Sequence, residues 1–169
     1  MIEQVNLEHN VLRLSDINST ELIDLLARYQ LDMQITPPLQ AIPGSFWGDD
    51  EAGLMGHQLF VREDTPIHSA LHEACHFVCM DDSRRQQLNT NAGNHQQEEN
   101  AACYLQILLA DNLPEMGRER MLVDMDAWGY SFRLGTAQAW FEQDAEETRN
   151  WLLKHGLIDT TNHPNYQLR

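Results

Sequence analysis

The chain has 169 residues, 42% of them hydrophobic and 8% aromatic, a composition typical of a globular protein rather than a disordered one. We expect a single domain over residues 1–169, with a core at about 20–114 and a helical extension from 115 to 169. No apolar run approaches the length that spans a membrane. The formal net charge of −15 repels phosphate backbones, which argues against direct binding of nucleic acid.

The first residues and the cysteines predict a cytoplasmic protein. The start, MIEQVNLEHN, has no basic segment followed by an apolar one, so no secretory signal is visible. The cysteines, Cys75, Cys79 and Cys103, are an odd number, and the first two lie one helical turn apart in an apolar stretch. Buried thiols in a reducing compartment fit this pattern best.

The first part of the chain predicts one helix followed by short strands. Asn18 has the character of a cap for a helix that ends near Gln30 and buries a leucine-rich stripe. Alternating apolar residues over 31–36, stopped by two prolines, predict a strand. Glycines punctuate 44–64, where we expect two or three more strands, most clearly 57–61. Together they predict a small, mostly antiparallel sheet.

Two helices are predicted next. Thr65 as cap and Pro66 as the first helical residue open a helix of about four turns. The polar stretch 81–97 is too poor in apolar residues for an element and predicts a loop. The second helix opens near Gln96 and ends at Pro114.

The last third of the chain is expected to be helical. Its clearest helix covers 136–156, from a threonine cap to a glycine stop. The polar tail after Ile158 is expected to be loose. Helices in both parts of the chain and a small sheet between them predict an α+β fold.

An HExxH motif, His72-Glu73-Ala74-Cys75-His76, falls on the first of the two central helices. Residues four apart project from one helical face, so both histidines can bind a single zinc ion at about 2.0–2.1 Å. Glu73 is the residue after His72 and projects in a different direction. It can form a hydrogen bond to a metal-bound water molecule instead of binding the metal itself. The alternative interpretation is a helix with two surface histidines and a glutamate.

A catalytic zinc site needs a third protein ligand, and Glu98 and Glu99 open the next helix. Glu98 shares its side with Ala101 and Leu105, whereas Glu99 aligns with Cys103. The apolar side faces inward, which favours Glu98 as the third ligand. Glu99 stays open as the alternative, because helix phase read from a sequence is uncertain by a residue.

The two helices and the loop between them resemble the ImmA/IrrE-type metallopeptidases, which are gluzincin-like. The segments that carry the resemblance are TPIHSALHEACH, EENAACY from residue 98, and two leucines at 108 and 109. The resemblance implies that His72, His76 and Glu98 bind zinc and that Glu73 is the general base. Ala102 stands where that family usually has Asn. The targets implied by the family are DNA-binding repressors.

The function favoured by these residues is hydrolysis of peptide bonds by a zinc metallopeptidase holding one zinc ion per chain. Its substrate would be a protein or peptide, which the edge of the sheet near residues 59–61 could hold as an added strand. The acidic chain favours a basic partner, for which a DNA-binding regulator is one choice. Two alternatives are a catalytically inactive, zinc-stabilised interaction module with an acidic binding surface, and a hydrolase of non-peptide amides.

Other histidines and one tyrosine leave choices open. His57, His95 and Tyr130 can each stabilise an oxyanion, and no spacing selects among them. His68 lies one turn before His72, but three histidines along two turns cannot close on one ion. We therefore expect His68 to support the site or to lie on the surface.

Overall fold

Seven α-helices and a three-stranded sheet make up the part of the fold that the computed structural model describes, residues 10–45, 50–87 and 96–169. The predicted α+β class is confirmed. In chain order the elements are α1 (Ser19–Ala27), β1 (Asp32–Thr36), β2 (Gly53–Met55), β3 (Gln58–Arg62), α2 (Ile67–Cys79), α3 (Asp82–Gln87), α4 (Gln96–Leu109), α5 (Gly117–Trp128), α6 (Ala137–Gln143) and α7 (Glu146–Lys154), with short 3-10 turns at Leu14–Asp16 and Ala110–Asn112.

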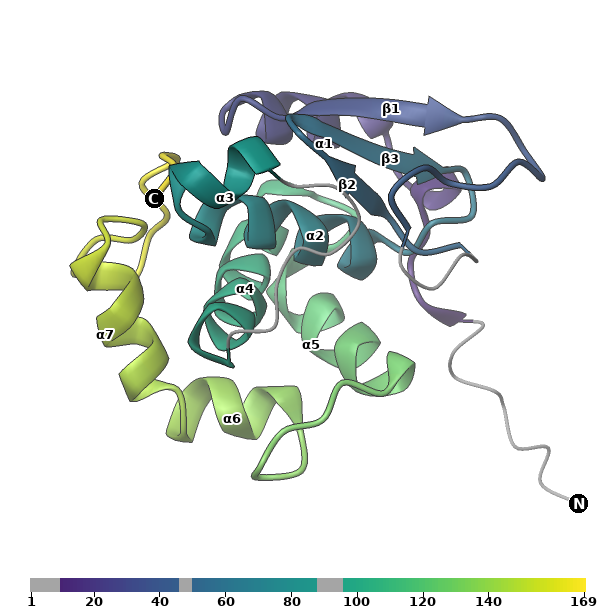
Figure 1. Cartoon of the computed structure of the whole chain (residues 1–169). Helices are drawn as coiled ribbons and strands as arrows, with labels where there is room; N and C mark the ends of the chain where they lie inside the picture. Colours follow the sequence, from purple (N-terminus) through teal and green to yellow (C-terminus); the bar gives the residue numbers. More distant parts are fainter. Residues whose placement is uncertain (1–9, 46–49, 88–95) are drawn as a thin grey trace, which may run out of the picture.

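The sheet has the strand order β1-β3-β2 and is mixed (Figure 1). β2 and β3 form an antiparallel hairpin in which Leu54 lies opposite Leu59. β1 adds to the other side of β3 and runs parallel to it, with Met33 opposite Leu59. The expected sheet was mostly antiparallel. It is mixed because β1 pairs with the second strand of the hairpin instead of the first, so β3 is the central strand and has neighbours on both sides.

Helix α2 is the centre of the fold and lies between the sheet on one side and α4 and α5 on the other (Figure 1). Eleven of its 13 residues are buried, and the two that are not are His72 and Glu73. The predicted start is off by one residue. Pro66 is the N-cap, and the Thr65 hydroxyl instead accepts a hydrogen bond from the backbone N–H of Arg62, which fixes the turn from β3 into α2.

A short helix, α3, lies in the stretch that was predicted to be a loop, and it holds the end of α2. Arg85 is 2% exposed, although it is charged. Its guanidinium donates to the backbone carbonyls of Phe77, Val78 and Met80, which have no partner within the helix. The predicted loop was wrong here because Arg85 forms hydrogen bonds that composition does not reveal.

The polar tail after Ile158 is anchored rather than loose. The backbone N–H of Arg169 donates to the Val78 carbonyl over 3.1 Å, and the guanidinium of Arg85 donates to the Arg169 carbonyl. Figure 1 accordingly places the C-terminus beside α3. Polar residues hold this tail through backbone hydrogen bonds, so its low hydrophobicity was a poor guide.

The helix expected over 136–156 is interrupted and forms α6 and α7. Asp144 ends α6 with a non-helical backbone and is bound by the guanidinium of Arg133. Thr136 caps α6 as predicted, its hydroxyl accepting from the N–H of Ala139. No helix in the described part of the chain is long and apolar enough to cross a membrane.

Candidate metal centre

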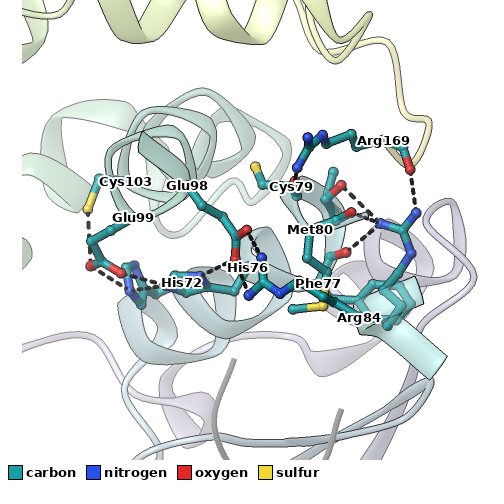
Figure 2. Close-up of polar contacts among 12 residues, drawn as sticks. His72, His76, Phe77, Cys79, Met80, Arg84, Glu98, Glu99, Cys103 and Arg169 are labelled. Carbon is teal, nitrogen blue, oxygen red and sulfur yellow. Dashed lines mark hydrogen bonds and ion pairs between the residues drawn. The ribbon is translucent and has the colours of Figure 1, made fainter. Parts of the chain in front are cut away.

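The two histidines of the motif meet a carboxylate from α4, which packs beside α2 (Figure 2). The Nε2 atoms of His72 and His76 are 3.1 Å apart. Glu99 reaches both of them, with Oε1 at 3.1 Å from His72 Nε2 and Oε2 at 2.6 Å from His76 Nε2. One ligand atom from each of the three residues lies within 4.8 Å of the others, so they form a possible metal site.

The spacing of these atoms fits a tetrahedral ion. Ligands about 2.0–2.1 Å from zinc lie about 3.3 Å apart in a tetrahedral site. The pair of nitrogens and the His72–Glu99 pair, both at 3.1 Å, match that edge, and the 2.6 Å His76–Glu99 contact is a hydrogen bond that an ion would widen. Imidazole and carboxylate are ligands that zinc accepts. The residues present therefore fit a zinc ion.

Gln106 fixes the orientation of His72. Its side-chain amide is fully buried and donates to the His68 carbonyl at 3.3 Å, so its oxygen faces His72. That oxygen accepts from His72 Nδ1 at 2.6 Å. A histidine that donates from Nδ1 keeps Nε2 free for a metal when the ring is neutral. By accepting from Nδ1, Gln106 thus leaves Nε2 of His72 directed toward the possible metal site.

Glu98 lies behind His76 instead of beside its metal-facing nitrogen. Its carboxylate is 3% exposed, lies 3.5 Å from His76 Nδ1, and forms an ion pair with Arg84 from α3 (Figure 2). The expectation that Glu98 points inward is therefore met. The donor group nevertheless contains Glu99, the alternative that sequence analysis favoured less. The reason is that the inward side of α4 faces Nδ1 of His76 and Arg84 at this turn. The Nε2 atoms of both histidines face the next residue of α4, Glu99.

Charges in the centre favour binding of protons when no metal is present. Burial lowers the pKa of His76, but the adjacent carboxylates of Glu98 and Glu99 outweigh burial and raise it. Burial raises the pKa of Glu99, and hydrogen bonds from His72 and His76 more than offset this and lower it. A metal ion that binds to this candidate site would have to displace protons held between the imidazoles and the carboxylate, which makes such binding pH-dependent.

Glu73 and its neighbour His72 are the two residues of helix α2 that are partly exposed to solvent. Burial raises the pKa of the Glu73 carboxyl group, and the neighbouring His72 and His76 reduce that shift without cancelling it. A carboxylate with a raised pKa beside two histidines has the character of a general base.

Tyr130 is the oxyanion candidate that the structure places at the centre. Its ring packs edge-on against His72, with centroids 5.6 Å apart, and its hydroxyl lies 3.1 Å from Nδ1 of His68. Gly129, with φ of +100°, ends α5 in a left-handed conformation that turns the chain toward this position. His68 is 1% exposed, so it supports the site from within and does not lie on the surface.

His57, another oxyanion candidate, lies away from the centre. His57 packs against Phe77 and lines a cavity of about 470 Å³ together with Arg85 and Arg169, near the C-terminal end of α2. His95 lies outside the described residues. Of the two candidates that the structure describes, Tyr130 contacts His72 of the motif and His57 packs against Phe77 instead.

All three cysteines are free and buried, as predicted for Cys75 and Cys79, but they differ in surroundings. Burial raises the pKa of Cys75 and of Cys79. Cys103 lies one turn beyond Glu99 on α4, with its sulfur 4.0 Å from Glu99 Oε1 (Figure 2). The sulfur that borders the metal centre is therefore that of Cys103, not one of the pair inside the motif helix.

Three residues of the centre had no assigned role in the sequence analysis: Arg84, Cys103 and Gln106. Gln106 had a signal, since it is a polar residue in the apolar run YLQILL, seven residues after Glu99 and on the same helical side. Arg84 had none, because its stretch resembled a loop. No protein-family model, no curated protein and no solved structure matches the chain. The likeness to a metallopeptidase family therefore depends on the motif and its geometry.

Proposed function

We propose that the protein is a zinc-dependent peptidase whose zinc ligands are His72, His76 and Glu99. The observation that carries the proposal is that the Nε2 atoms of His72 and His76 both lie next to the carboxylate of Glu99. Beside them lies Glu73, whose carboxyl group has a raised pKa. Three protein ligands with one position left over is the arrangement typical of catalytic zinc. The Glu99 side chain is 43% exposed and that of His72 is 13% exposed, so a substrate can reach the centre from solvent.

The chemistry follows from the positions of the side chains. Zinc, when bound, polarises a carbonyl group and lowers the pKa of water toward about 7. Glu73 accepts the proton of the attacking water and delivers it to the leaving amine. The hydroxyl of Tyr130 donates to the carbonyl oxygen as negative charge develops on it. Gln106 accepts a hydrogen bond from His72 Nδ1, and the Glu98 carboxylate faces His76 Nδ1 at 3.5 Å, so both side chains favour the orientation that leaves Nε2 for the metal.

The substrate is a protein or peptide held in an extended form. The expected docking edge near Leu59 and Val61 is wrong, because β3 is paired on both sides. Within the described part of the chain, the outer strands of the sheet are β1 and β2, and an added strand would pair with one of these. The net charge of −15 supports a basic protein substrate, including a DNA-binding regulator. Salt-sensitive retention of basic proteins by the inactive Glu73→Gln variant tests this choice.

The Glu73→Gln variant also tests the proposed reaction. It should bind zinc as the wild type does and hydrolyse an unstructured protein such as casein at least about 100-fold more slowly, because only the proton acceptor has changed. Full activity of this variant would contradict the assignment. A zinc-loaded wild type without activity on any peptide would favour the interaction module with an acidic surface.

A further inference from the structure

His68 is a buried polar residue of α2 whose ring has an unequal pair of nitrogens. The residue is 1% exposed, and its Nδ1 atom lies 3.1 Å from the hydroxyl oxygen of Tyr130. Its Nε2 atom is also buried and has no hydrogen-bond partner within the described part of the chain. The ring packs against those of Trp128 and Tyr130, with centroids 5.0 Å and 5.4 Å away. The direction of the hydrogen bond at Nδ1 therefore decides what the Tyr130 hydroxyl can do.

The unpartnered Nε2 indicates which atom is the donor in that hydrogen bond. Burial lowers the pKa of His68 to about 3, so at neutral pH the ring carries one proton, on one nitrogen only. If Tyr130 donated to Nδ1, that proton would lie on Nε2, as a buried N–H without an acceptor among the described residues. In protein interiors an N–H without a partner is rarer than an acceptor without one. The proton therefore lies on Nδ1, and His68 donates to Tyr130.

Gln106 supports the same direction. Burial raises the pKa of Tyr130, and a side-chain hydrogen bond with Gln106 is among the interactions that oppose this shift. Donation to a phenolic oxygen has this effect, because it stabilises the deprotonated form. The oxygen of Tyr130 thus serves as an acceptor on its inner side, which leaves the hydroxyl hydrogen for another partner.

We propose that His68 is a positioning residue that donates from Nδ1 to the oxygen of Tyr130 and so directs the hydroxyl hydrogen toward the carbonyl oxygen of a bound substrate. Tyr130 is partly exposed and packs against His72, whereas His68 is buried behind it. The hydrogen bond from His68 also makes the hydroxyl a stronger donor, because linked hydrogen bonds polarise one another. The effect on the reaction rests on the proposed peptidase function, whereas the direction of the hydrogen bond does not.

Nuclear magnetic resonance tests the direction of the bond on the wild type, without any measurement of turnover. Long-range ¹H–¹⁵N correlation spectra of protein labelled with ¹⁵N-histidine distinguish a protonated ring nitrogen from a bare one. His68 should show a protonated Nδ1 and a bare Nε2, with its signals assigned by their loss in His68→Gln. His57 is an internal reference for this form, because its Nδ1 lies 3.0 Å from the Gln30 carbonyl, which can only accept. A protonated Nε2 in His68 would overturn the proposal.

A matched pair of variants tests whether His68 acts through Tyr130. His68→Asn keeps a donor near the position of Nδ1 and should keep kcat on casein within about 3-fold, whereas His68→Leu has no donor and should lower kcat by about 10-fold with little change in KM. In a Tyr130→Phe background, His68→Leu should cause no further loss, because the hydroxyl on which it acts is absent. An equal loss in both backgrounds is the result expected of a merely structural residue and would overturn the proposal.

The two proposals fail separately. A protonated Nδ1 in a zinc-loaded wild type that hydrolyses no peptide would refute the peptidase and leave the hydrogen bond as assigned. Hydrolysis by a wild type with a protonated Nε2 would refute the role of His68 and leave the peptidase in place. The wild-type spectra decide the direction of the bond even where a variant does not fold.

Discussion

Glu98 and Glu99 are neighbours in the sequence, but the structure places their carboxylates at different nitrogens of His76, so matched substitutions by Gln should have crossed effects. Glu98 is 3% exposed and lies between Arg84 and His76 Nδ1. The Glu99 side chain is 43% exposed and faces both Nε2 atoms. Glutamine keeps the size of the side chain and removes its charge, so each variant isolates one carboxylate.

Stability of the metal-free protein should fall mainly in Glu98→Gln. Loss of one partner from a fully buried ion pair costs about 3–5 kcal/mol. The Arg84 side chain is 28% exposed and regains water when Glu98 is neutral, which reduces the loss. We expect the free energy of unfolding to fall by about 1–3 kcal/mol in Glu98→Gln and by less than about 1 kcal/mol in the half-exposed Glu99→Gln.

Metal affinity should fall in the opposite order. Residues that orient a ligand through its second nitrogen contribute about 10–100-fold to affinity, which is the loss we expect for Glu98→Gln. Glu99→Gln removes a ligand and should weaken zinc binding by more than about 100-fold. Competition with a chromogenic zinc chelator measures the affinities, and urea unfolding measures the stabilities. Weaker zinc binding in Glu98→Gln than in Glu99→Gln would refute the assignment of Glu99 as the ligand.

Three further substitutions test other parts of the structure. Arg85→Met leaves buried carbonyls at the end of α2 without partners and should lower the free energy of unfolding by about 3–5 kcal/mol; a loss under about 1 kcal/mol in urea would contradict this role. Burial lowers the pKa of His68 to about 3, so between about pH 3 and pH 6.5 the unfolded chain binds this proton and the folded chain does not. Stability should therefore fall by about 2 kcal/mol from pH 7 to pH 5, and His68→Gln, measured the same way, should lack this part of the slope. Tyr130→Phe should keep zinc and lower kcat by about 100–1000-fold; an unchanged kcat would remove the hydroxyl from the reaction.

Much of the fold could be predicted because local patterns and packing agree. The periodic burial of apolar residues around Leu71 and Ala101 predicted α2 and α4, and the alternation at Leu59 and Val61 predicted β3. The partner and the direction of β1 could not be predicted. β1 can pair with either strand of the hairpin, and the sequence does not show whether it pairs with β2 or with β3. Helix α3 could not be predicted either, since its stability depends on Arg85 reaching carbonyls of another element.

The candidate site shows the same division. His72, Glu73 and His76 could be predicted as site residues because the two histidines are four residues apart on one helix, and this spacing is visible in the sequence. The choice between Glu98 and Glu99 depends on the rotation of α4 against α2, where one residue changes the direction of a side chain by about 100°. The apolar side of α4 predicts which residues are buried, but the candidate donor group opens to solvent, and its carboxylate, Glu99, lies at the border of that side.

Zinc content tests the central claim most directly. Wild-type protein purified without added metal should contain about one zinc per chain by mass spectrometry, and His72→Ala and Glu99→Ala should each lose most of it while keeping the fold by circular dichroism. His57→Ala, which changes a histidine away from the centre, serves as the control and should keep its zinc. Zinc that stays at the wild-type level in both His72→Ala and Glu99→Ala would contradict a metal centre built from these residues.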